Sequence, residues 1–502
     1  MIGAALSVLQ PHLPVLQIVV PLIAAPACFA LGRGNRAWAL AVAVSWVAFG
    51  ISAWLLATVM DTGPISYALG NWPAPWGIEY RVDALNGFVL LVVSGIGAVT
   101  LPYTRRSVAH ELPESQQGAF YTAFLLCLTG LLGVAITGDA FNLFVFLEIS
   151  SLSSYALIAL GRDRRALTAS FQYLVMGTIG ATFIVIGIGL LYMATGTLNM
   201  ADLAARIPAV ADSRTVLAAL AFIAVGATLK LALFPLHFWL PNAYAYAPSV
   251  VTAFLAATAT KVSVYILVRF FFTVFGAAYT YEVLALDNLL IPFSVVAILV
   301  CSTVAIFQTD VKRLLAYSSI AQIGYIILGI GLGSETGLTA GLVHLFNHAV
   351  TKGALFLALG CVVLRVGTPR LDALAGLGRA MPWTMFAFVL AGLSLIGVPL
   401  TAGFVSKWYL VQAALEADAW YLAVVVLASS LLALVYVWRV VEAAYLRPVP
   451  EGAPSLAARE APLSMLIPTW ILAGASVYFG IDTSLNVGVA RAAAQFLLGS
   501  GG

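Results

Sequence analysis

The chain has 502 residues, of which 62% are hydrophobic and only 9% are charged. Soluble domains carry roughly 25% charged residues, so this composition excludes a soluble globular protein and leaves no room for a sizeable soluble domain. The net charge of +3 is too small to indicate a nucleic-acid partner.

Apolar runs long enough to cross a bilayer as helices recur from end to end. We expect an all-α polytopic membrane protein with about 14 transmembrane helices. The predicted spans are 13–32, 37–58, 83–102, 119–138, 140–160, 167–195, 216–240, 248–276, 287–309, 311–333, 336–366, 383–413, 419–445 and 463–480. Residues 61–81 are polar, aromatic and punctuated by Pro and Gly, which predicts an extracytoplasmic loop, with a hairpin as one possibility.

Basic residues separate cleanly between alternate loops of this arrangement. One set of loops carries Arg33, Arg36, Arg105, Arg106, Arg162, Arg164, Arg165, Lys312, Arg313, Arg365, Arg370, Arg379, Arg447 and Arg459. The opposite loops and the tail carry only Arg81, Arg206, Arg214 and Arg491. Cytoplasmic loops are the ones enriched in Lys and Arg, so both termini are predicted to be extracytoplasmic.

Two of the predicted spans are interrupted by proline at equivalent positions. Helix 7 has Pro235 five residues after Lys230, and helix 12 has Pro399 eight residues before Lys407. Proline removes a backbone donor and breaks or kinks a helix, and freed carbonyls at depth must line protein or water. Broken helices at matching places indicate two inverted five-helix repeats, helices 4–8 and 9–13. Two ordinary proline kinks are the alternative.

This pattern divides a single integral membrane domain, residues 1–502, into four parts. These are N-terminal helices 1–3 (1–118), a first repeat (119–276), a second repeat (287–445), and a cytoplasmic loop, last helix and tail (446–502).

One Glu and four Lys lie deep in the apolar spans: Glu148, Lys230, Lys261, Lys352 and Lys407. Each ionised group at bilayer depth costs about 2.5–3.5 kcal/mol on the lenient insertion scale, so a functional role is expected. We predict that Lys230 pairs with Glu148, either as a gate or as a static ion pair.

Further polar residues extend this set. Ser151 and Tyr155 share a helix face with Glu148 and offer hydroxyls to a water chain, and Tyr265 follows Lys261 by one turn. Arg269 lies closer to its helix end, so we expect it to reach the headgroup region.

A polar stripe follows in helix 11, where His344, His348 and Lys352 are spaced by four residues and are joined by Asn347 and Thr351. A proton relay and structural hydrogen bonding are both open for this stripe. A metal site is disfavoured, because neither a carboxylate nor a thiolate lies nearby in the sequence. For Lys407, snorkelling to the interface is the alternative to a place on the relay.

Four buried Lys against one buried Glu cannot all remain charged without a large uncompensated desolvation cost. Some of them are therefore expected to alternate between charged and neutral forms. That behaviour is suited to carrying protons.

Five segments resemble the signature regions of a known family, the antiporter-like subunits of respiratory complex I and of multisubunit Mrp-type cation/proton antiporters. They read FNLFVFLEISSLSSYALIALG, LKLALFPLHFWLPNAYAYAPSVVTAFLAATATKVSVYILVRF, DVKRLLAYSSIAQIGYIILG, HLFNHAVTKGALF and GVPLTAGFVSKWYLVQA. The resemblance implies that Glu148, Lys230, Lys261 and Lys407 form a central polar axis, with His344, His348 and Lys352 as its helix-11 part. By length the chain is most similar to the D-type Mrp subunits, with the N-type complex I subunits as close relatives.

The resemblance leaves two functions open. One is proton translocation in a multisubunit Na⁺ (or K⁺)/H⁺ antiporter, and the other is proton pumping in a complex I-like NADH:quinone oxidoreductase. The four Cys are widely spaced and G-x-G spacings lie inside an apolar helix, so redox chemistry would belong to other subunits. We expect no cofactor or metal in this chain, other membrane subunits as partners, and a prokaryotic plasma-membrane location. An inert polar axis is a third possibility.

Overall fold

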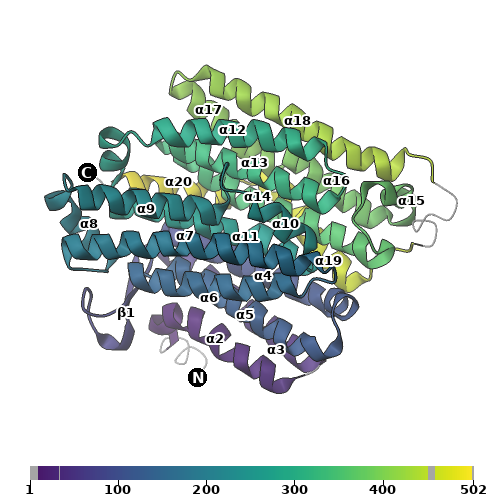
Figure 1. Ribbon diagram of the computed structural model, residues 1–502, viewed down its shortest axis with the longest axis horizontal. Helices are drawn as coiled ribbons and strands as arrows, with labels where there is room; N and C mark the ends of the chain where they lie inside the picture. The colour runs from purple at the N-terminus through teal and green to yellow at the C-terminus, as the bar shows by residue number, and fades with distance from the viewer. Residues whose placement is uncertain (1–8, 33, 450–457, 500–502) are drawn as a thin grey trace.

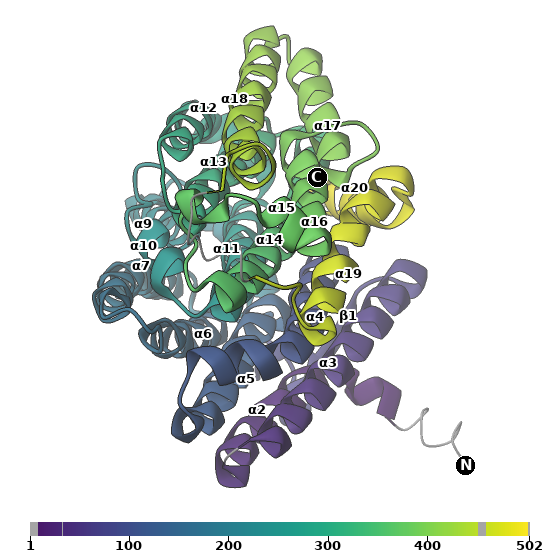
Figure 2. The same ribbon diagram turned by 90° about the vertical axis from the view of Figure 1, so that its right-hand side faces the viewer.

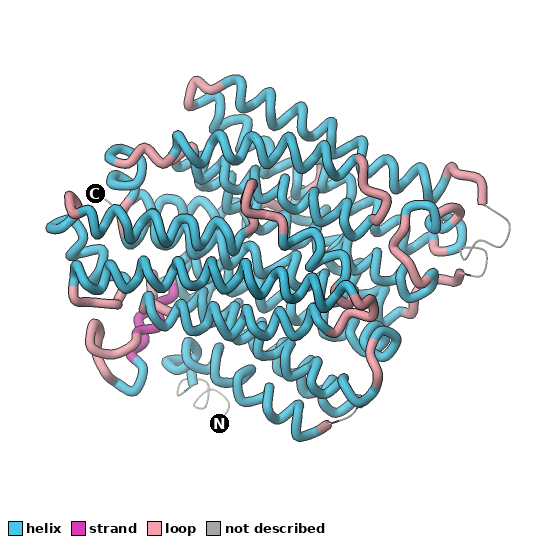
Figure 3. Tube along the Cα trace, in the orientation of Figure 1, coloured by secondary structure: helices cyan, strands magenta, loops and turns pink. Residues whose placement is uncertain are grey.

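The computed structural model describes residues 9–32, 34–449 and 458–499. Its long helices lie side by side, with one short hairpin at an end of the bundle (Figures 1 and 3). Thirteen of the described helices are long and apolar enough to cross a membrane. The prediction of an all-α polytopic membrane protein is therefore confirmed. Arg33 and residues 450–457 of the predicted cytoplasmic loop lie outside the described residues.

The N-terminal part contains two helices, a hairpin and a third helix. They are α2 (Leu13–Leu31, preceded by η1, Gln10–His12), α3 (Asn35–Thr62), β1 (Ile65–Ala68), β2 (Glu79–Val82) and α4 (Ala84–Glu111). β1 and β2 pair antiparallel, with Ile65 opposite Val82, so the 61–81 segment does form a hairpin. α4 begins at a capping box between Asp83 and Asn86 and runs well past its predicted end at residue 102.

The first five-helix set follows this N-terminal part. Its helices are α5 (Glu114–Ile136), α6 (Ala140–Ala159), α7 (Arg165–Thr195), the broken pair α9 (Arg214–Leu231) and α10 (Trp239–Tyr246), and α11 (Ser249–Val268). The short α8 (Met200–Arg206) and η3 (Ile207–Val210) link α7 to α9, and α11 continues as the π-helix η4 (Arg269–Val274). The predicted break of helix 7 at Pro235 is therefore present.

The second set repeats this order. Its helices are α12 (Asp287–Ile306), α13 (Val311–Gly331), α14 (Glu335–Val366), the broken pair α16 (Pro382–Ile396) and α17 (Ala402–Glu416), and α18 (Trp420–Tyr445). A second π-helix, η5 (Tyr279–Val283), precedes the set, and η6 (Leu371–Leu374) and α15 (Leu377–Ala380) link α14 to α16. The fourth member is broken in both sets, as the proline positions predict.

Two helices end the chain, α19 (Leu463–Ile481) and α20 (Ser484–Gly499). The residues after the last predicted span were expected to form a tail, but they form the helix α20. Its buried residues Val487, Ala490, Ala494 and Leu497 recur at helical spacing and pack one face of the helix inward. α20 packs on α14 and α4, so residues far apart in the sequence close this side of the bundle.

Three helices, α11, α13 and α14, form the buried centre of the bundle. α14 packs against α11, α13, α16, α17, α19 and α20, and Figure 2 shows it in the middle of the molecule. Glycine permits the closest of these contacts, because a Cβ on Gly329 of α13 would lie 2.6 Å from the carbonyl oxygen of Gly337 on α14. The polar residues of α13 and α14 are thereby held away from lipid.

A buried ion pair joins the start of α4 to the end of α11. Arg269 Nη1 lies 2.8 Å from Asp83 Oδ2, and both side chains are almost completely buried. The guanidinium also donates to the hydroxyls of Tyr265 and Thr273, each at 3.1 Å. The expectation that Arg269 reaches the headgroup region is therefore wrong, because a buried carboxylate compensates its charge.

Removing one member of this pair leaves an uncompensated buried charge. We expect Asp83→Asn or Arg269→Met to lower the free energy of unfolding by about 3–5 kcal/mol. The double variant removes both charges and should be more stable than either single variant. Thermal unfolding of the purified protein in detergent measures this. Single variants that melt like the parent would contradict a structural role for the pair.

Candidate functional site

The break between α9 and α10 lies beside the predicted Glu148–Lys230 pair. α9 ends at Leu231 because Ala232 takes a left-handed conformation with φ +59°, and the chain runs through Pro235 before α10 begins at Trp239. The indole N–H of Trp239 donates to the carbonyl oxygen of Leu229 at 3.1 Å. That carbonyl oxygen also accepts from the backbone N–H of Ala232 at 3.2 Å, so two neutral donors meet at the end of α9.

Lys230 and Glu148 approach each other as predicted. Lys230 Nζ lies 3.8 Å from Glu148 Oε1 and donates a shorter hydrogen bond, 2.7 Å, to the hydroxyl of Ser151. The lysine is buried, whereas the Glu148 side chain is 26% exposed on the flank of α6. The closest partner of the ammonium is therefore a hydroxyl, and Glu148 Oε1 is buried with no hydrogen-bond partner among the described residues.

Tyr155 lies one turn beyond Ser151 on α6. Its ring packs edge-on against Tyr173, with centroids 4.8 Å apart. Its hydroxyl is buried and has no hydrogen-bond partner among the described residues. The predicted water chain along Ser151 and Tyr155 stays a prediction, and this unpartnered hydroxyl is compatible with it.

Lys261 is completely buried at mid-length on α11. Its Nζ donates to the carbonyl oxygen of Ala256 and approaches the hydroxyl of Thr260 at 3.4 Å. Within the described part of the chain it has no carboxylate at ion-pair distance, and the ionisable groups that interact with it electrostatically are His344, His348 and Lys352. Lys261 therefore rests on neutral oxygens alone.

The helix-11 stripe lies on α14, and its residues make two kinds of contact. Asn347 Nδ2 donates to the carbonyl oxygen of Ala402, and the Thr351 hydroxyl lies 3.1 Å from that of Ser394. These two residues hold the ends of the second broken helix. His344 and Lys352 make the other contacts, to α13 and α17.

His344 makes hydrogen bonds through both ring nitrogens. Nε2 lies 3.0 Å from the Gln322 side-chain oxygen on α13, and Nδ1 lies 2.8 Å from the Ser406 hydroxyl on α17. That hydroxyl lies 3.2 Å from the Gly403 carbonyl oxygen. Ser406 can donate to a neutral His344, or accept from a protonated one while donating to Gly403. The site therefore accommodates both charge states of the imidazole.

His348 stacks nearly parallel to His344, with ring centroids 6.2 Å apart. Neither of its ring nitrogens has a hydrogen-bond partner among the described residues. Buried polar groups are normally hydrogen-bonded, so an imidazole without a protein partner in the core indicates a place for water. One turn further along α14, the Lys352 amine donates to the carbonyl oxygen of Leu315 at 2.9 Å and also contacts the Ser318 hydroxyl.

Lys407 lies at the second break and does not snorkel. Its Nζ donates to the carbonyl oxygens of Leu395 and Ile396, at 3.2 and 2.8 Å, and to the Ser430 hydroxyl at 2.9 Å. The amine also lies 5.0 Å from the ring centroid of Tyr325. α16 ends just before Gly397, where φ is +92° and a Cβ would lie 2.9 Å from the Lys407 side chain.

One face of α13 was not singled out from the sequence. Ser318, Gln322 and Tyr325 recur at positions i, i+4 and i+7 and contact Lys352, His344 and Lys407 respectively. This face could have been identified from the sequence, because its polar residues recur at helical spacing in an otherwise apolar span. The segment YSSIAQIGY thus lines the axis and joins its three second-set members.

The charges along this axis remain unbalanced. Among the described residues, Lys261, Lys352 and Lys407 have only neutral oxygens within bonding distance, and Lys230 has the one nearby carboxylate. A carbonyl or hydroxyl oxygen accepts from a neutral amine as well as from an ammonium. These three positions can therefore hold lysine with or without its extra proton.

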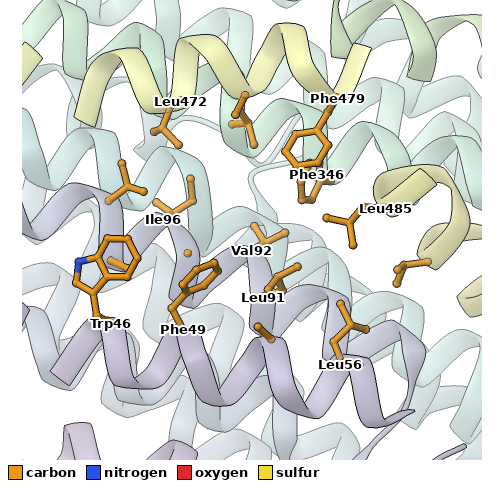
Figure 4. Close-up of a pocket in the computed structure, with 18 of the residues that line it drawn as sticks. Trp46, Phe49, Leu56, Leu91, Val92, Ile96, Phe346, Leu472, Phe479 and Leu485 are labelled. Carbon is orange, nitrogen blue, oxygen red and sulfur yellow. The ribbon is translucent and has the colours of Figure 1, made fainter. Parts of the chain in front are cut away.

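An apolar cavity of about 480 Å³ lies elsewhere, between α3, α4, α14, α19 and α20. Figure 4 shows its aromatic and aliphatic walls, with Phe49 and Leu91 on one side and Leu472 and Phe479 on the other. All its lining residues are apolar or glycine, so it contributes no titratable group to the axis.

Comparisons with known proteins agree with this arrangement. Residues 137–433 match the family described as NADH:quinone oxidoreductase/Mrp antiporter, TM. The N-type subunit of the NADH-quinone oxidoreductase of Desulforudis audaxviator is 45% identical over 94% of this chain and 96% of its own length. The D-type subunit of the Na(+)/H(+) antiporter of Alkalihalophilus pseudofirmus is 34% identical over 76% of each chain.

Solved structures extend the similarity to the fold. A chain of the Mrp complex from Dietzia sp. superimposes with a TM-score of 0.88 at 26% identity, covering 98% of both chains. The broken helices and these similarities lead to one assignment: the chain belongs to the NADH:quinone oxidoreductase/Mrp antiporter transmembrane family.

Proposed function

We propose that this chain is the D-type, proton-translocating subunit of a multisubunit Na⁺ (or K⁺)/H⁺ antiporter. The observation that carries the proposal is the line of buried lysines held by neutral oxygens, with Lys230 and Lys407 at the two helix breaks. The similarity to the D-type subunit of an Na(+)/H(+) antiporter and to a chain of an Mrp complex supports it.

In this proposal, protons move by transfer between amines, imidazoles and hydroxyls along the axis. Glu148 and Lys230 form the gate, because the carboxylate stabilises the ammonium only while the two side chains lie close together. Lys261 with His344, His348 and Lys352 forms the middle, and Lys407 forms the far end. Ser151, Tyr155 and Tyr265 supply hydroxyls beside the axis, and Asn347 holds the second broken helix in place.

Proton pumping in a complex I-like oxidoreductase is the second candidate function. The 45% identity to the N-type subunit of an NADH-quinone oxidoreductase favours it. Both functions would use the same lysines, and they differ in the source of energy. In the second function, electron transfer in other subunits would drive the charge movements.

The exposure of Glu148 supports an assembly with other membrane subunits. A Glu148 side chain that is 26% exposed on a helix flank at bilayer depth would contact lipid if the chain were alone. We propose that a neighbouring membrane subunit covers it. The distribution of basic residues supports a plasma-membrane orientation with both termini extracytoplasmic.

Removing either member of the gating pair should stop transport. We expect Lys230→Ala or Glu148→Ala to reduce ion-coupled proton movement to background while the complex still assembles. Proton movement in inverted vesicles, with native gel electrophoresis for assembly, measures both properties. Arg214→Ala, an exposed cation at the other end of α9, serves as the control. Parental transport in either gating variant would refute the assignment.

Replacement of Lys407 separates proton transfer from a structural charge. Arg keeps the charge and its donors but does not release a proton in proteins. We therefore expect both Lys407→Arg and Lys407→Met to lose transport. A purely structural cation would instead be replaced by Arg with transport retained. Rates are compared at equal amounts of assembled complex.

The driving ion distinguishes the two candidate functions. In vesicles that contain the full complex and an imposed proton gradient, addition of Na⁺ or K⁺ should collapse the gradient if the protein is an antiporter subunit. Failure with both cations, together with proton pumping that depends on an electron donor, would favour the oxidoreductase.

A further inference from the structure

A polar cavity of about 490 Å³ opens on the side of the bundle that is rich in basic residues. It lies between the end of α4, the link from α10 to α11, the start of α13 and the segment that follows α14. Glu111, Asp310 and Lys312 are among its lining residues. The hairpin and the Asp83–Arg269 pair lie at the opposite ends of α4 and α11. This cavity therefore opens on the face of the molecule opposite the hairpin.

Lys312 is the buried cation of this cavity, with a side chain only 5% exposed. Its Nζ donates to the carbonyl oxygen of Ala247 at 3.0 Å. Among the described residues it has no carboxylate within ion-pair distance, although Glu111 and Asp310 face it. A buried ammonium in a polar cavity with one protein acceptor has two further N–H groups that water can satisfy.

Both facing carboxylates already have structural partners. Glu111 accepts from the Ser107 hydroxyl at 2.9 Å and from the backbone N–H of Ser249 at 3.0 Å. Asp310 caps α13 by accepting from the backbone N–H of Arg313 at 3.0 Å, and burial raises the pKa of its carboxyl. Lys312 therefore faces two carboxylates that are engaged with neutral donors, and it has no fixed charged partner of its own among the described residues.

The same helix connects this lysine to the central axis. Leu315 lies three residues after Lys312, about one turn along α13, and its carbonyl oxygen accepts from Lys352 Nζ. The hydroxyls of Ser318 and Ser319 each lie 2.9 Å from that carbonyl oxygen. Lys352 therefore bonds to α13 about one turn beyond Lys312, at a carbonyl oxygen that two serine hydroxyls share.

We propose that Lys312 is the proton-loading residue of the axis and that this cavity is its aqueous entrance. A proton from the aqueous phase, carried by the cavity water as hydronium, binds the Lys312 amine and leaves neutral water behind. The ammonium then releases a proton, through the cavity water and the Ser318 hydroxyl, to a neutral Lys352 amine, and Lys312 returns to its neutral form. This inference rests on the proposed function and adds to it a route by which protons from the basic face reach the axis.

Accessibility to a charged thiol reagent tests the entrance without any transport measurement. The four native cysteines are buried, so the parent complex serves as the background. Lys312→Cys should react with a membrane-impermeant methanethiosulfonate added on the basic face and not when it is added on the hairpin face. Exposed Arg106→Cys should react rapidly on the same face, and buried Leu328→Cys should not react.

Absence of labelling of Lys312→Cys from the basic face, or labelling from the hairpin face only, would overturn the entrance. If this variant does not assemble, Ala247→Cys, at a buried position that also lines the cavity, replaces it, with the same expected and contrary results. Because labelling needs no ion gradient, it tests whether water reaches Lys312 from the basic face even if the antiporter and pump assignments both fail.

Two further variants separate proton loading from a structural hydrogen bond. Lys312→Gln keeps a donor for the Ala247 carbonyl oxygen, and Lys312→Arg keeps both donor and charge, but neither can exchange a proton at neutral pH. We expect at least a tenfold loss of transport for both, with normal assembly, and parental rates for the exposed control Arg106→Gln. Parental rates in either Lys312 variant of a transporting complex would overturn the loading role.

Discussion

At three positions in the centre of this protein, an ammonium group would be buried away from any carboxylate among the described residues. Such a charge is costly to desolvate, and the fold compensates this cost by holding oxygen acceptors at the positions that the lysine amines reach. The backbone supplies these oxygens at Ala256 and Leu315 and at the second break, and serines supply others. The central helices pack closely because they carry these acceptors and must exclude lipid from them.

The same requirement explains why α13 matters more than its sequence first indicates. It has no charged residue beyond its first turn, yet its side chains contact Lys352, His344 and Lys407. A neutral helix among cations can accept hydrogen bonds without fixing the protonation state of any partner. A carboxylate in the place of Gln322 would instead bind one charge state firmly and slow its exchange.

Much of this site could be predicted from the sequence, because deep charges and prolines stand out in apolar spans. The Glu148–Lys230 contact, both helix breaks and the hairpin were predictable for that reason. The partner of Arg269 was not, because Asp83 lies 186 residues away and only the packing of α4 on α11 brings the two together. α20 was missed because a 16-residue helix with small residues gives a weak hydropathy signal. The role of Asn347 in holding a broken helix also depended on tertiary contacts.

The two breaks differ in what completes their backbone. At the first, the Leu229 carbonyl oxygen accepts from the Ala232 N–H and the Trp239 indole, and Lys230 donates to Ser151 on another helix, so the charge of Lys230 can change without affecting the helix end. At the second, the Lys407 amine itself bonds to the last carbonyls of α16. A neutral amine still has N–H donors, so losing a proton weakens this contact without abolishing it. Protonation of Lys230 is therefore independent of the backbone conformation at the first break, whereas protonation of Lys407 is linked to the backbone conformation at the second. Gain or loss of a proton thus moves the backbone in one half of the molecule and not in the other.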